Sequence, residues 1–169
     1  VDKERIVHVL SWNQIQTDEG VAEALRQVKE ARLIPEEKVR LCVIGDGAKW
    51  IWKQAEALFP TAVEVLDYYH CAEHLYKVAM AQFDDDPVRE REWVEASKAR
   101  LFFGFEDWVI EDLKTMEPKD EQAAEEIRKL IGYLAENAER VNYGSLRRGG
   151  YPIGSGAIES ANKAISHVR

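Results

Sequence analysis

The chain has few cysteines, no long hydrophobic run and no excess of basic residues. Its two cysteines among 169 residues are too few for a disulfide framework, which favours an intracellular protein. No apolar stretch approaches the roughly 18–20 residues that a membrane-spanning helix needs, so a membrane protein is not expected. The net charge of −8, taken as a whole, argues against a nucleic-acid-binding surface.

The charge is nevertheless spread unevenly along the chain. Acidic residues concentrate between residues 84 and 139, whereas residues 142–169 carry a single acid, Glu159. The basic side chains of that last segment are Arg147, Arg148, Lys163 and Arg169. The total charge therefore does not decide whether this end of the chain contacts DNA. Arg147, Arg148 and Lys163 are the residues that would do so, and an ordinary solvated loop around Arg147 and Arg148 is the alternative.

Strand-like and helical segments alternate in the first part of the chain. The predicted strands are 5–12, 39–44 and 62–66, which are rich in branched apolar residues. Periodic apolar positions predict helices over 18–32 and 50–58 between them. This order predicts an α/β fold in which parallel strands are joined by crossover helices.

The pattern becomes helical after Tyr69. Pro87 directly after Asp86 is typical of a helix start. The helices expected from here are 87–102, 105–115 and 119–140. Aromatic side chains are expected to pack this helical part, namely Trp93, Phe102, Phe103, Phe105 and Trp108. A glycine-rich basic loop over 142–152 then leads to a last helix over 155–167.

Three acids are candidates for metal chemistry. Asp46 and Asp67 each end an apolar strand, so that parallel strands would place both at one edge of the sheet. Glu159 begins a helix that is entered through the small residues 154–156. Carboxylates gathered in this way bind Mg²⁺ or Mn²⁺, and two such ions cleave phosphodiesters. Each acid also has a structural interpretation: Asp46 as a turn residue, Asp67 as a helix cap, and Glu159 as a partner of its own helix N-terminus.

The segment His70-Cys71-Ala72-Glu73-His74 supports a different chemistry. It fits the HxxEH pattern of inverted zinc proteases, in which His70 and His74 bind zinc and Glu73 is the general base. Glu159 would be available as the remaining ligand. Such short matches also arise by chance, because histidines one turn apart can simply pack against each other.

Three segments taken together are more specific than any single residue. They are GDGAKWIW (45–52), LFPTAVEVLDYYHCAEHL (58–75) and YPIGSGAIESANK (151–163). In their order and their residues they resemble the DDE transposases of bacterial insertion sequences, in a branch related to the Mutator-like group. The resemblance implies an RNase H-like fold whose three acids bind Mg²⁺ or Mn²⁺.

The resemblance also implies roles for particular residues. Asp46 matches the second acid of the triad and Glu159 the third. Asp67 and His70 match a signature that the group carries after a Phe-Pro pair, so both are expected to shape the site or contact DNA. The implied organisation is a truncated RNase H-like core over 1–75, a large all-helical insertion with its basic loop over 76–150, and the final core helix over 151–169.

No residue of the chain matches the first acid, which should end a strand upstream. The expected function is therefore that of a catalytic-core fragment of a DNA transposase that is inactive alone. DNA and further copies of the chain are the expected partners, in the cytoplasm or on the nucleoid. A zinc protease and a non-catalytic DNA-binding remnant of a transposase are the alternatives.

Overall fold

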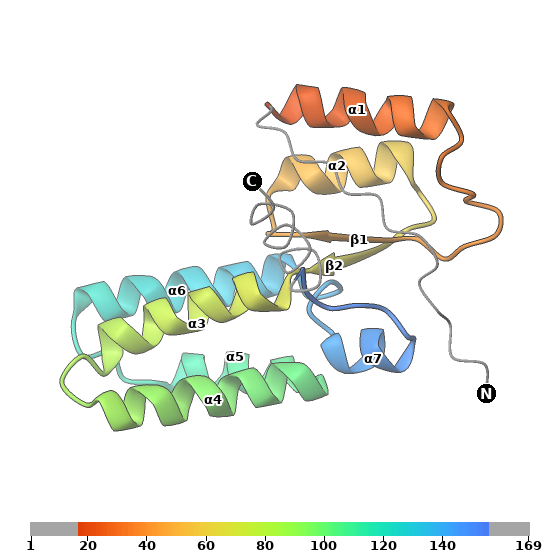
Figure 1. Ribbon diagram of the computed structural model, residues 1–169. Helices are drawn as coiled ribbons and strands as arrows, with labels where there is room; N and C mark the ends of the chain where they lie inside the picture. Colours follow the sequence, from red (N-terminus) through yellow and green to blue (C-terminus); the bar gives the residue numbers. More distant parts are fainter. Residues whose placement is uncertain (1–16, 156–169) are drawn as a thin grey trace, which may run out of the picture.

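Two short parallel strands form the sheet in residues 17–155, the part of the chain that the computed structural model describes (Figure 1). Strand β1 (Cys42–Gly45) pairs with β2 (Val63–Leu66) in a register that runs from Cys42 opposite Val63 to Gly45 opposite Leu66. Both strands lie where the sequence predicts them, and their parallel pairing is confirmed. The predicted strand 5–12 lies outside the described residues.

Helices α1 (Asp18–Glu30) and α2 (Lys49–Leu58) pack against each other on one side of the strands (Figure 1). The Thr17 side chain caps α1 by accepting a hydrogen bond from the Gly20 amide. Helix α2 connects β1 to β2, which is the strand–helix–strand order expected for a parallel pair. The chain is thus a mixed α/β protein, although most of its described residues are helical.

Four helices extend from the carboxyl ends of the strands as a bundle (Figure 1). They are α3 (Tyr68–Gln82), α4 (Pro87–Phe103), α5 (Glu106–Thr115) and α6 (Glu121–Glu136). Asp86 caps α4 as predicted, accepting from the Arg89 amide at 3.0 Å. Helix α6 ends earlier than the predicted residue 140, because Asn137 leaves the helical path and its side chain donates to the Tyr133 carbonyl at 2.9 Å.

The prediction of a loop over 142–152 is wrong for its first half, which forms the short helix α7 (Tyr143–Arg148). The Asn142 side chain accepts from the Ser145 amide at 3.0 Å and so supplies a cap. Tyr143 is fully buried and Leu146 is nearly so. Burial of these two side chains stabilises the helix despite the neighbouring glycines.

A continuous aliphatic core joins the sheet to the bundle. It includes Val65 and Leu66 of β2, Leu75 of α3 and Leu134 of α6, all with no exposed surface. The predicted aromatic packing is wrong for three residues, because Phe103, Phe105 and Trp108 are 60%, 46% and 61% exposed. Within residues 17–155 no helix has the length and apolar character that crossing a membrane requires.

Candidate functional site

The site lies at the carboxyl edge of the two strands. Asp46 follows the last residue of β1, and Asp67 follows the last residue of β2. Since Gly45 and Leu66 are register partners, the two acids leave the sheet side by side. The Asp67 amide donates to the Gly45 carbonyl at 2.7 Å, which ties the two strand ends together.

The Asp46 side chain is exposed and only partly engaged. Its Oδ1 accepts from the Ala48 amide at 2.9 Å, forming a turn around Gly47. Gly47 has a backbone φ of +98°, a conformation that residues other than glycine rarely adopt. No described residue hydrogen-bonds or pairs with Oδ2, so that oxygen can accept a cation or a proton donor.

The Asp67 carboxylate is buried and has partners on both oxygens. Oδ1 caps α3 by accepting from the Tyr69 amide at 2.8 Å and the His70 amide at 3.2 Å. Oδ2 accepts from the Ser155 amide at 2.8 Å. Burial alone raises the pKa of the Asp67 carboxyl, but the bonds from the Ser155 side chain and backbone and from the α3 amides outweigh it, so the pKa lies below its usual value.

Asp67 therefore acts as an anchor between distant parts of the chain. Next to the hydrogen bond between Asp67 and Ser155, the Tyr68 amide donates to the Ile153 carbonyl at 2.8 Å. The segment that continues towards Glu159 is thus held at the carboxyl end of β2. Glu159 itself lies outside the described residues, as does Lys163.

His70 and His74 lie one turn apart on α3 with ring centroids 5.3 Å apart. The His70 Nδ1 atom is 3.2 Å from the Glu73 carboxylate. The His74 ring stacks on Tyr133 of α6 at a centroid distance of 4.3 Å. Among residues 17–155 no three His, Cys, Asp or Glu side chains are grouped to hold a metal ion, and Glu159, the further ligand in the protease hypothesis, is outside that range.

Burial lowers the pKa of His74 below 6.5, and the neighbouring Lys77 and His70 lower it further. We expect an NMR titration of the His74 ring to have its midpoint below 6.5. Because the unfolded chain binds this proton more readily, the contribution of His74 to stability is complete above about pH 6.5 and decreases as the pH falls. A midpoint above that of the urea-unfolded chain would contradict this arrangement.

The two described arginines of the predicted DNA contact lie in the last turn of α7. Arg147 is exposed, donates to the Phe102 carbonyl at 3.2 Å and places its guanidinium 3.5 Å from the centre of the Phe102 ring. Arg148 is also exposed. Helix α7 thus presents two cations on the surface, the first of them held in place by α4.

Two residues of this site were missed by sequence reasoning. Tyr133 donates from its hydroxyl to the Asp46 carbonyl at 2.8 Å, and Ser155 binds Asp67 as described. Tyr133 lies beside the apolar stripe of α6. Its aromatic ring with a polar hydroxyl is the only feature of the sequence that indicates a contact of this kind. Ser155 lies between two glycines, and its small size is the only feature that the sequence offers there.

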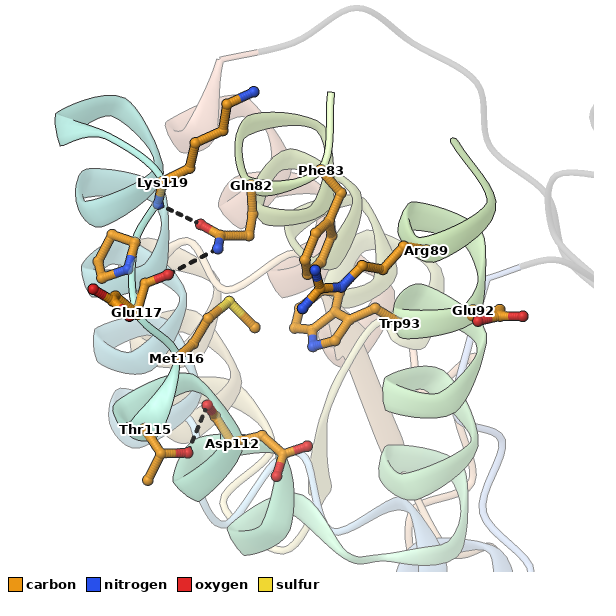
Figure 2. A pocket seen from close by; sticks show the side chains of 11 residues that line it. Gln82, Phe83, Arg89, Glu92, Trp93, Asp112, Thr115, Met116, Glu117 and Lys119 are labelled. Atoms are coloured by element: carbon orange, nitrogen blue, oxygen red, sulfur yellow. Dashed lines mark hydrogen bonds between the residues drawn. The ribbon is translucent and has the colours of Figure 1, made fainter. Parts of the chain in front are cut away.

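A separate cavity of about 660 Å³ lies at the far end of the bundle (Figure 2). Phe83, Trp93 and Met116 form its apolar surface. Gln82 holds one wall by donating to the Glu117 carbonyl and accepting from the Lys119 amide. The described candidate catalytic residues, Asp46, Asp67 and His70, do not line this cavity.

Comparison of the chain with protein-family models, curated proteins and solved structures gives no match in any of the three.

Proposed function

We propose that the chain is the catalytic-core part of a DNA transposase, with an RNase H-like core and phosphodiester hydrolysis and strand transfer as its chemistry. The observation that carries the proposal is the arrangement at the sheet edge. An exposed acid, Asp46, follows one parallel strand, and the buried acid after the next strand binds the segment that leads to Glu159. The resemblance of the three motifs supplies the reaction.

The described residues fit one part of a divalent-metal site. Asp46 has an oxygen that no described residue engages, and carboxylate oxygens are the ligands that Mg²⁺ and Mn²⁺ prefer. Asp67 fits poorly as a ligand, because its carboxylate is buried and its acceptor sites are used by the Tyr69 and His70 amides and by the backbone and side chain of Ser155. Asp46 and Glu159 would hold the metal together with the first acid of the triad, which the resemblance places on a strand upstream of β1.

When bound, the metal would activate a water or hydroxyl and stabilise the leaving oxygen of a phosphodiester. In this proposal Asp67 positions the approach to Glu159, and His70 lies beside the site with its Nδ1 atom directed at Glu73. Arg147, Arg148 and Lys163 would contact the DNA backbone without reading its sequence.

Metal binding to the intact chain tests the proposal without requiring turnover. We expect Mn²⁺, followed by electron paramagnetic resonance, to bind the chain, and Asp46→Asn to weaken this binding about tenfold or more, because a neutral amide is a poor ligand for a hard cation. Asp107→Asn is the matched control, since Asp107 is an exposed aspartate on α5.

Equal Mn²⁺ affinity of the parent chain and Asp46→Asn would contradict the proposed metal site. Stoichiometric Zn²⁺ binding that His70→Ala and His74→Ala abolish would favour the protease alternative instead. DNA binding without any Mn²⁺ site would favour a non-catalytic remnant.

A further inference from the structure

Tyr133 connects the helical bundle to the turn that carries Asp46. The residue belongs to α6, more than 80 positions along the chain from that turn. Its hydroxyl donates to the Asp46 carbonyl oxygen at 2.8 Å. Its ring stacks on His74 at 4.3 Å with an interplanar angle of 23°. The side chain is thus held from both ends, by α3 at the ring and by the turn after β1 at the hydroxyl.

The turn is built for this close approach. A Cβ atom on Gly47 would lie 2.9 Å from the Tyr133 ring and 3.2 Å from its hydroxyl oxygen. The absence of a side chain at Gly47 therefore allows both the positive φ of the turn and the contact with Tyr133. The same turn contains the Ala48 amide that orients the Asp46 carboxylate through Oδ1.

The Tyr133 hydroxyl is the donor of this hydrogen bond, because a backbone carbonyl oxygen can only accept. Burial raises the pKa of Tyr133 well above its usual value, and the neighbouring Cys71 and Asp46 raise it further. A protonated phenol bonded to a backbone carbonyl restricts the rotation of that peptide. Through the peptide it restricts the direction in which the Asp46 carboxylate points.

We infer that Tyr133 is a positioning residue for Asp46, through which the helical bundle fixes the candidate metal ligand at the sheet edge. The inference rests on the proposed function in taking Asp46 as a ligand. Its structural part, the fixing of the turn, does not depend on any metal. The two parts can therefore be measured separately.

The test is Tyr133→Phe, which keeps the ring on His74 and removes only the hydroxyl. We expect hydrogen exchange at the Ala48 amide, measured by NMR, to accelerate about fivefold to tenfold, because one hydrogen bond that orders the turn is lost. Mn²⁺ affinity should fall about threefold or more. Amides in the middle of α6, such as that of Ile127, should keep their exchange rates.

Two further variants complete the test. Tyr76→Phe is the matched control, because Tyr76 is an exposed tyrosine of α3 whose hydroxyl forms no hydrogen bond with a described residue. It should change neither measurement. Gly47→Ala pushes against Tyr133 from the other side and should also accelerate exchange at Ala48 and weaken Mn²⁺ binding.

The outcomes separate this inference from the proposed function. Unchanged Ala48 exchange and unchanged Mn²⁺ affinity in Tyr133→Phe would overturn the inference. Accelerated exchange throughout α6 would also overturn it, because Tyr133 would then serve general stability only. Accelerated exchange confined to the turn, in a parent chain that binds no Mn²⁺, would support the positioning role and contradict the proposed metal site.

Discussion

Asp67→Asn is expected to lower the free energy of unfolding by about 2–3 kcal/mol, although it changes a single atom. The amide oxygen can still cap α3, since asparagine caps helices as well as aspartate does. The other atom becomes an NH₂ group that faces the Ser155 amide, which is itself a donor. A buried charge-assisted hydrogen bond is thereby replaced by two opposed donors, and urea denaturation measures the cost.

Asp86→Asn is the matched control for this experiment. Asp86 also caps a helix, but it is exposed and its Oδ1 accepts from the Arg89 amide alone. The substitution should change stability by less than about 0.5 kcal/mol. Equal effects at the two caps would show that Asp67 does no more than cap α3.

The effect of Asp67 also has a defined pH range. Because the pKa of the folded-state carboxyl is lowered from 3.8, its contribution is complete above that value and is lost as the pH falls through the folded-state pKa. The stability difference between the parent chain and Asp67→Asn should be constant above about pH 5 and decrease below about pH 4.

The sequence predicts the local elements well because their signals are local. The strand before Asp46 is a run of branched apolar residues, and the start of α4 combines a capping aspartate with a proline at the first helical position. The parallel pairing followed from the strand–helix–strand order. The RNase H-like core remains a proposal, since it requires strands beyond the pair that the structure describes.

Predictions failed where a contact between distant segments decides the conformation. Glycines 144, 149 and 150 favour a loop locally, but burial of Tyr143 against the bundle stabilises α7. The core between α4, α5 and α6 is filled by the aliphatic side chains of these helices. Three aromatic residues that would suit a core are therefore exposed, namely Phe103, Phe105 and Trp108. The total hydrophobic content of a segment does not say which of its residues face inward.

Part of the candidate site is likewise predictable from the local sequence, and part depends on contacts between distant segments. The sequence placed Asp46 and Asp67 at one sheet edge because strand order alone implies it. The sequence leaves open whether Asp67 caps a helix or serves the site. In the structure its carboxylate caps α3 through Oδ1 and accepts a hydrogen bond from the Ser155 amide through Oδ2. The contact of Tyr133 with Asp46 joins residues 87 positions apart, and no spacing rule within one helix or strand reports such a contact.

A substitution of Gly144 is also expected to lower stability strongly, because α7 lies against the end of α4 with no room for a side chain at this position. A Cβ atom on Gly144 would be 2.8 Å from the Phe103 carbonyl carbon, 3.0 Å from the Gly104 Cα atom and closer still to the Phe103 carbonyl oxygen. These are backbone atoms, so neither side can yield by changing a rotamer. Gly144→Ala must therefore move α7 away from α4.

We expect Gly144→Ala to lower the free energy of unfolding by about 2–3 kcal/mol in urea denaturation, the range found when extra volume forces a backbone shift. Ser145→Ala, at the next and exposed position, should change it by less than about 0.5 kcal/mol. Since Arg147 is held over Phe102 by the same packing, movement of α7 should also release its guanidinium from that ring. A fully stable Gly144→Ala protein would mean that α7 does not pack against α4 as described.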